Sequence, residues 1–135
     1  MELQVGVKVL IKHASGKYLL QRRNPKKYPE AQIGWDVVGG RIIPGITLLE
    51  NLTREVKEET GLTLIKVEKI LAAQDILRVE GKHIVRITYL GSAKGKIRLD
   101  RGENTEYKWF SPEELKSLSK DSLDMYFAEI LKNTW

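Results

Sequence analysis

The chain has 135 residues, of which 41% are hydrophobic and 30% are charged, a globular composition that excludes a largely disordered protein. It contains no cysteine, which excludes a disulfide framework and a thiolate metal site. The formal net charge of +5 favours an anionic partner, but the basic residues are spread along the chain, so charge alone is weak support for nucleic-acid binding.

The length suits one compact domain, and we expect a single domain over residues 1–135. No apolar run reaches the length of a signal core or a membrane span. We therefore expect a cytoplasmic protein that does not associate with membranes.

The chain is predicted to open with a β-hairpin followed by a loop. Residues 3–11 alternate apolar and polar side chains, and after a Ser15-Gly16 turn residues 17–22 return as a second strand. Residues 23–34 hold two prolines and several charges without periodicity. We expect a surface loop there, of a length at which loops are often functional, and it could form one wall of a site.

A helix is predicted over residues 48–60. Thr47 and Glu50 have the spacing of a capping box, in which the hydroxyl and the carboxylate each accept a hydrogen bond from a free amide at the start of the helix. Gly61 is placed to end the helix.

The rest of the chain predicts further strands and two more helices. Gly91, Gly95 and Gly102 are expected to break up the segment that follows the predicted strand at residues 83–90. Ser111 is followed by Pro112 and has Glu114 three positions on, an order that favours a helix start, and an amphipathic helix is expected from about Ser122. The remaining apolar or β-branched stretches, read as strands or strand approaches, are residues 35–38, 64–77, 83–90 and 106–110. This order predicts an α/β (α+β) fold with a mixed sheet covered by helices.

Three acids crowd the last two turns of the predicted 48–60 helix. Glu55, Glu58 and Glu59 fall at the edge of its apolar stripe, where like charges three and four residues apart repel and where acids oppose the helix dipole. A hard divalent cation such as magnesium would compensate, because it prefers oxygen ligands. The alternative is a solvated face on which Arg54 and Lys57 pair with the acids.

Residues 40–62 resemble the Nudix box. That pattern reads glycine, five residues, glutamate, seven residues, then Arg-Glu-apolar-any-Glu-Glu-any-Gly-apolar; Gly40 is its glycine, and residues 54–62 match every specified position of its second half. Ile46 departs from the pattern, because it occupies the slot of the intermediate glutamate and so removes a supporting carboxylate. The resemblance implies the fold of the Nudix family, an α/β/α sandwich around a mixed β-sheet.

The resemblance also implies a metal site. By position, Glu55, Glu58 and Glu59 would bind Mg²⁺, with Mn²⁺ as a substitute, and the backbone carbonyl of Gly39 would be a further ligand. Arg54 would hold a neighbouring carboxylate in its ligating position. The three glutamates are also the candidate catalytic residues, and which acid takes the proton from water is left open.

A few residues outside the box are weaker candidates. Family members often add an acid from a loop late in the chain, a role for which we prefer Glu106 over Glu103. Arg22 and Arg23 could grip substrate phosphates, since guanidinium groups suit phosphate. Trp35 could stack on a base, although packing at the start of a strand is the commoner role.

The resemblance implies a magnesium-dependent hydrolase that cleaves a pyrophosphate bond in a nucleoside diphosphate linked to a group X. Marks of the subgroups for ADP-ribose, dinucleoside polyphosphates and coenzyme A are not evident, so we expect a MutT-like nucleoside triphosphate pyrophosphohydrolase. The alternatives are a catalytically weak nucleotide-binding module, for which Ile46 is the sequence support, and an RNA-end-associated Nudix protein. Nucleic acid is otherwise not expected as a partner, and a homodimer stays open because many relatives are dimers.

Overall fold

The computed structural model describes residues 1–23, 34–98 and 105–134, and of Arg23 and Thr105 only the main chain. The loop predicted over residues 23–34 lies almost entirely outside these ranges, as does Glu103. The elements in chain order are β1 (Glu2–Lys12), β2 (Tyr18–Arg23), β3 (Val38–Arg41), α1 (Leu48–Thr60), β4 (Thr63–Ile76), β5 (Lys82–Lys94), β6 (Thr105–Phe110), α2 (Pro112–Ser117), a 3₁₀ turn (Lys120–Ser122) and α3 (Met125–Thr134).

The first strand, β1, organises a mixed sheet of six strands. It runs parallel to β5 over its whole length, from Glu2 opposite Lys82 to Lys12 opposite Ser92. It pairs antiparallel with β3 and with β2. The order is β4-β5-β1-β2-β6, with β3 attached to β1.

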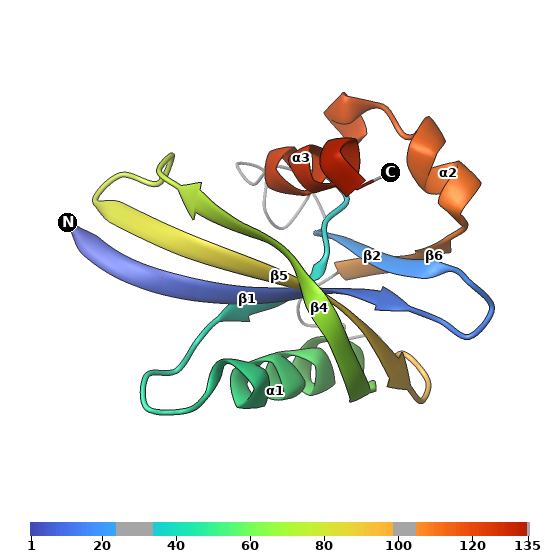
Figure 1. The fold of residues 1–135 in the computed structure, drawn as a ribbon, viewed down its shortest axis with the longest axis horizontal. Coiled ribbons are helices and arrows are strands. Elements are labelled where there is room, and N and C mark those ends of the chain that lie inside the picture. Colours follow the sequence, from blue (N-terminus) through green and yellow to red (C-terminus); the bar gives the residue numbers. More distant parts are fainter. Residues whose placement is uncertain (24–33, 99–104, 135) are drawn as a thin grey trace.

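Helices cover both faces of this sheet. α1 lies against one face, and α2 and α3 lie over the other (Figure 1). The alternation along β1 separates two cores, because fully buried Val9 packs in the cluster of Leu52 from α1, whereas Leu10 packs in the cluster of Phe127 from α3. The α/β/α sandwich around a mixed sheet is therefore confirmed.

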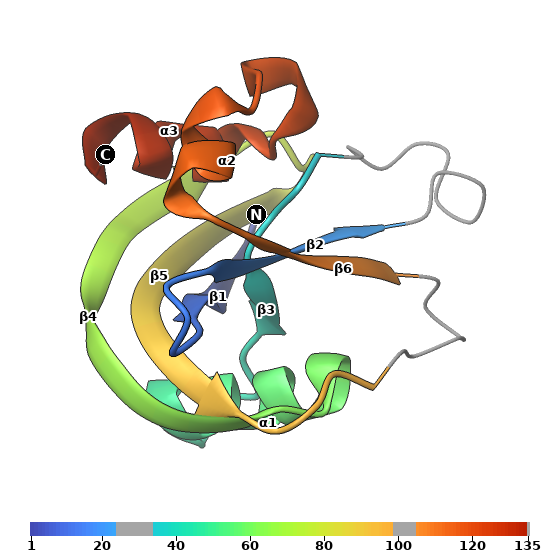
Figure 2. The same cartoon turned by 90° about the vertical axis from the view of Figure 1, so that its right-hand side faces the viewer.

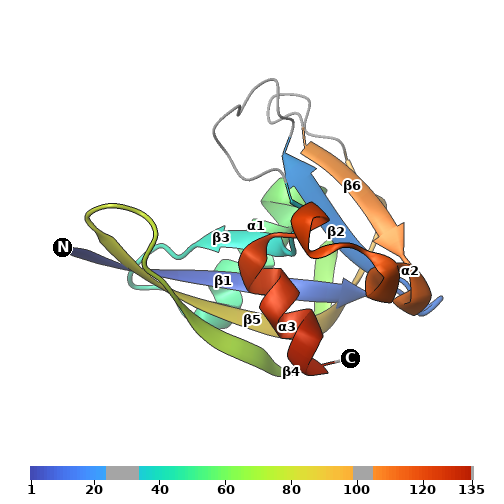
Figure 3. The same cartoon turned by 90° about the horizontal axis from the view of Figure 1, so that it is seen from above.

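The long β4-β5 pair connects the two layers. Figure 2 shows both strands curving from the side of α3 to the side of α1, and Figure 3 shows α3 from above. The pairing has register shifts at three places along β4, which are the irregularities that bend a strand. Among the helices of the described ranges, none combines the length and the apolar character needed to cross a bilayer.

The bounds predicted for α1 are confirmed at both ends. The Thr47 side chain accepts a hydrogen bond from the Glu50 amide at 3.1 Å, and Gly61 ends the helix with a left-handed φ of 80°. The predicted capping box is half formed, because the Thr47 hydroxyl also donates to the Glu50 carboxylate at 3.0 Å and that carboxylate faces the hydroxyl instead of the Thr47 amide.

Three boundaries differ from the prediction by three or more residues. β3 covers Val38–Arg41 and so includes the glycine pair, whereas the apolar run at residues 35–38 was expected to precede that pair. β5 does not stop at Gly91 but continues to Lys94, because Gly91 pairs with Val67 and lets the Lys66 carbonyl approach to within 2.6 Å of where a Cβ would lie. The last helix begins at Met125 and not near Ser122, since the Asp124 carboxylate caps it by accepting from the amides of Tyr126 and Phe127, both at 3.0 Å.

Candidate active site

A cavity of about 540 Å³ lies where β3 meets the C-terminal half of α1. This volume is in the range of about 300–1,000 Å³ that small-molecule sites occupy. Acids, bases and main-chain groups from both layers contribute to it. Its lining residues are Gly6, Lys8, Asp36, Gly39, Gly40, Arg41, Glu55, Glu59, Ile76, Arg78, Val79, Ile84, Arg86 and Asp124.

The glycine pair of β3 brings the main chain close to β1 and to a box glutamate. A Cβ on Gly39, whose φ is 146°, would lie 2.0 Å from the Val7 carbonyl oxygen. A Cβ on Gly40 would lie 2.7 Å from a carboxylate oxygen of Glu55. Both positions therefore require glycine, the first for backbone packing and the second for the placement of Glu55.

Glu59 is a partly buried acid that lines the cavity. Its carboxylate accepts hydrogen bonds from the Gly39 amide at 3.1 Å and from the Gln21 side chain at 3.3 Å. Burial raises the pKa of Glu59, and the negative charge of Glu55 raises it further, while Lys8 and the Gly39 amide only partly oppose this rise. The charge and the donors beside Glu59 offset only part of the cost of ionising it next to Glu55. Two such neighbouring carboxylates form a donor set that suits a hard cation.

Arg54 holds the other two box glutamates. Its Nη1 donates to Glu55 at 2.9 Å and to Glu58 at 3.2 Å, so both carboxylates meet at one nitrogen. The Glu55 side chain is 13% exposed, whereas that of Glu58 is 61% exposed and does not line the cavity. Within the described ranges, no three acidic or imidazole side chains are gathered closely enough to hold a metal ion.

The floor of the cavity is a buried ion network that the sequence prediction missed. The Arg86 guanidinium donates to Asp36 at 2.5 Å and to Asp124 at 3.2 Å, and Lys8 lies 3.5 Å from Asp36. Burial alone would raise the pKa of Asp36, but Lys8 and Arg86 outweigh burial, so that its pKa lies below the ordinary value. The only signal in the sequence was the presence of charges within apolar strand segments.

The weaker candidates form a separate group at the β2-β6 edge. Arg22 donates to both oxygens of Glu106, at 3.1 and 3.0 Å, and its guanidinium lies 4.6 Å above the Trp35 ring. Trp35 is 9% exposed and packs edge-on against Phe110. The structure thus brings Arg22, Trp35 and Glu106 together, but none of them lines the 540 Å³ cavity.

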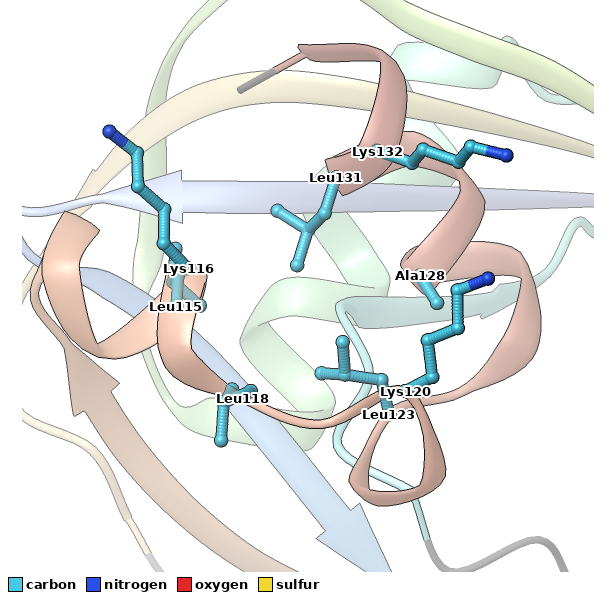
Figure 4. Close-up of a pocket in the computed structure, with 8 residues that line it drawn as sticks. All are labelled: Leu115, Lys116, Leu118, Lys120, Leu123, Ala128, Leu131 and Lys132. Carbon is cyan, nitrogen blue, oxygen red and sulfur yellow. The ribbon is translucent and has the colours of Figure 1, made fainter.

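A second hollow, of about 310 Å³, lies between α2 and α3 (Figure 4). Leucine side chains converge on its floor, and Lys116, Lys120 and Lys132 extend from its rim. Among the described residues that line it none is an acid, so it offers no carboxylate ligand for a metal. The larger cavity is therefore the candidate site.

Comparisons with known proteins match the fold of the chain. The model of the NUDIX domain family matches residues 2–129. The structure is similar to that of a MutT NUDIX hydrolase from Burkholderia pseudomallei, with a TM-score of 0.80, 27% identity and 100% coverage of both chains. It is also similar to a MutT protein from Methanosarcina mazei Go1, with a TM-score of 0.79, 27% identity, and coverage of 98% of this chain and 92% of that one.

A relative from Bacillus subtilis (strain 168) carries the name "Putative 8-oxo-dGTP diphosphatase". It is 32% identical over 108 residues, which are 79% of this chain. The match spans 66% of the relative's own length, just under two thirds.

Proposed function

The chain belongs to the NUDIX domain family of hydrolases, which act on phosphorus-containing acid anhydrides, and from this premise we propose that it is a magnesium-dependent, MutT-like nucleoside triphosphate pyrophosphohydrolase. One observation carries the proposal. Glu55 and Glu59 line the same 540 Å³ cavity as Gly39 and Gly40, beside the ion network in which Lys8 and Arg86 pair with Asp36 and Asp124. The carboxylates of Glu55 and Glu59 suit a hard cation.

The metal in this proposal is held by Glu55, Glu58 and Glu59, with the Gly39 carbonyl as a further ligand. The shared contact with Arg54 supports the inclusion of Glu58, because it keeps that carboxylate beside Glu55. When bound, the ion would neutralise charge that develops on the phosphates and lower the pKa of a water molecule.

The chain's own groups have separate tasks in the proposed reaction. One of the box glutamates, or Glu106, accepts a proton as water attacks phosphorus, and the products are a nucleoside monophosphate and pyrophosphate. Arg22 is proposed to bind phosphate, with the Trp35 ring as the platform on which its guanidinium lies. Arg23 is proposed for the same task from the neighbouring position in β2.

The test is a panel of nucleoside triphosphates incubated with Mg²⁺ or Mn²⁺ and followed by ³¹P NMR. Because the Bacillus subtilis relative is named for 8-oxo-dGTP, this nucleotide belongs in the panel beside the unmodified ones and ADP-ribose. We expect pyrophosphate release from at least one triphosphate. Binding of a nucleotide without turnover would favour the binding module instead.

Variants of the box glutamates sharpen this test. Glu55→Gln and Glu59→Gln are each expected to lower kcat by about 100-fold or more, since each removes a charge required for metal binding or proton transfer. Glu129→Gln, on the exposed side of α3, is the matched control and should leave kcat unchanged. Unchanged turnover in both box variants would contradict the proposal.

A further inference from the structure

Asn51 is a fully buried polar residue in the first turn of α1, and its amide holds the loop that precedes the helix. The side-chain NH₂ group donates to the carbonyls of Thr47 at 2.9 Å, Ile46 at 3.2 Å and Ile43 at 3.4 Å. The side-chain carbonyl accepts from the Ile43 amide at 2.8 Å. One amide group thus satisfies both donors and acceptors of the loop between β3 and α1.

The same carbonyl also contacts the guanidinium that holds the candidate ligands. Arg54 Nη2 donates to Asn51 Oδ1 at 2.9 Å, while Nη1 of the same group donates to Glu55 and Glu58. The planar guanidinium transmits the constraint, because fixing Nη2 also fixes the direction of Nη1. Asn51 is therefore linked to two box carboxylates through a single rigid group.

On its loop side, Arg54 Nη2 donates to Asn51 Oδ1 at 2.9 Å and, at the longer distance of 3.4 Å, to the Arg41 carbonyl. Its Nε is buried and has no hydrogen-bond partner among the residues that the structure describes. Ile46, in the slot where the box pattern has a glutamate, provides only its main-chain carbonyl, and that carbonyl is bonded to Asn51. The Asn51 side chain thus accepts a hydrogen bond from Arg54 beside a loop in which isoleucine replaces the glutamate of the box pattern.

We infer that Asn51 is a positioning residue: it orients Arg54, and through Arg54 it holds Glu55 and Glu58 in place for the metal. This inference rests on the proposed function. Asn51 does not line the 540 Å³ cavity, so its effect is that of an outer residue that orients ligands. Loss of such residues commonly lowers metal affinity about 10- to 100-fold.

The first test is Mn²⁺ binding by electron paramagnetic resonance in the absence of substrate. Asn51→Ala removes the closer acceptor of Arg54 Nη2 and leaves the Arg41 carbonyl at 3.4 Å, so it should weaken Mn²⁺ binding about tenfold or more. Asn51→Asp keeps the acceptor for Arg54 but loses the donors to the loop, so it should retain Mn²⁺ affinity within about threefold even where its melting temperature falls. Equal loss of affinity in the two variants would overturn the inference.

A matched control separates positioning from stability. Leu52→Val, at the fully buried neighbour that faces the core, should lower the melting temperature without touching Arg54. We expect its Mn²⁺ affinity to equal that of the unsubstituted chain. If Asn51→Ala also kept this affinity and only its melting temperature fell, the role of Asn51 would be structural and the inference wrong.

A measurement without metal distinguishes this inference from the proposed function. Rotation of the Arg54 guanidinium, followed by ¹⁵N NMR, should be slow in the unsubstituted chain and in Asn51→Asp but fast in Asn51→Ala. Equal rotation rates in the three proteins would refute the role of Asn51 alone. Absence of Mn²⁺ binding by the unsubstituted chain would instead refute the proposed metal site, and the inference with it.

Discussion

Gly40 couples a main-chain position to a candidate metal ligand. A methyl group in its place would lie 2.7 Å from Glu55 Oε2 and would push a flexible side chain, not the backbone. We expect Gly40→Ala to lower kcat about 10- to 100-fold through displacement of the Glu55 carboxylate, with little change in melting temperature. Steady-state kinetics with Mg²⁺ and calorimetry would measure the two effects.

Gly39 provides the contrast to that prediction. Its missing Cβ would collide with the backbone of β1, at 2.0 Å from the Val7 oxygen, so Gly39→Ala should lose stability as well as activity. A Gly40→Ala protein with full activity would show that Glu55 does not depend on this contact.

The residues of the candidate site were predictable to very different degrees. Glu55, Glu58 and Glu59 could be proposed because their spacing within a single helix matches the box pattern, whereas helix geometry alone left a solvated face open. Arg86, Asp36 and Asp124 could not, since they come from three distant segments whose contact depends on the tertiary fold. The sequence also did not reveal that Arg22 lies over Trp35, because these residues are joined only through the pairing of separate segments.

At the scale of elements, α1 depends on its N-cap. Thr47→Ala removes the acceptor for the Glu50 amide and should lower the free energy of unfolding by about 1 kcal/mol. Chemical denaturation would measure this loss. Thr53→Ala is the matched control, because the exposed Thr53 hydroxyl bonds only to the Leu49 carbonyl one turn back, a contact that adds no stability to a helix. Equal losses in the two variants would contradict a capping role.

The bounds of α1 were easier to predict than the end of β5 for a physical reason. The ends of α1 are set by Thr47 and Gly61, which act on amides and carbonyls within one turn. The length of β5 is set by its partners β1 and β4, which the local sequence does not contain. Gly91 was therefore misread as a break, although the close approach of β4 makes it a strand residue.

At the scale of the molecule, the network around Arg86 joins β5, the segment before β3 and the start of α3. The lowered pKa of Asp36 means that its ionised form is stabilised by folding. Its contribution to stability is therefore present above its unfolded pKa of about 3.9, and it is lost as pH falls through the lower folded pKa. We expect stability to decline steeply below about pH 4.

Asp36→Asn tests the origin of that decline. The variant should be less stable than the unsubstituted chain at pH 7, because Arg86 and Lys8 lose a charged partner, and the difference should narrow as pH falls below about 4. Thermal unfolding between pH 2 and pH 8 would measure the difference. Glu129→Gln is the exposed control, and a constant difference at every pH would exclude Asp36 as the cause.

The parallel pairing of β1 with β5 also bears on how the protein is made. β1 is synthesised long before Lys82–Lys94, so the main-chain groups on one edge of β1 stay without their β5 partner until that segment has been translated. Until then the carboxylates of α1 have no assembled sheet against which to be held. Translation products that stop before β5 should consequently be substrates for chaperones and proteases, with no partial catalytic activity of their own.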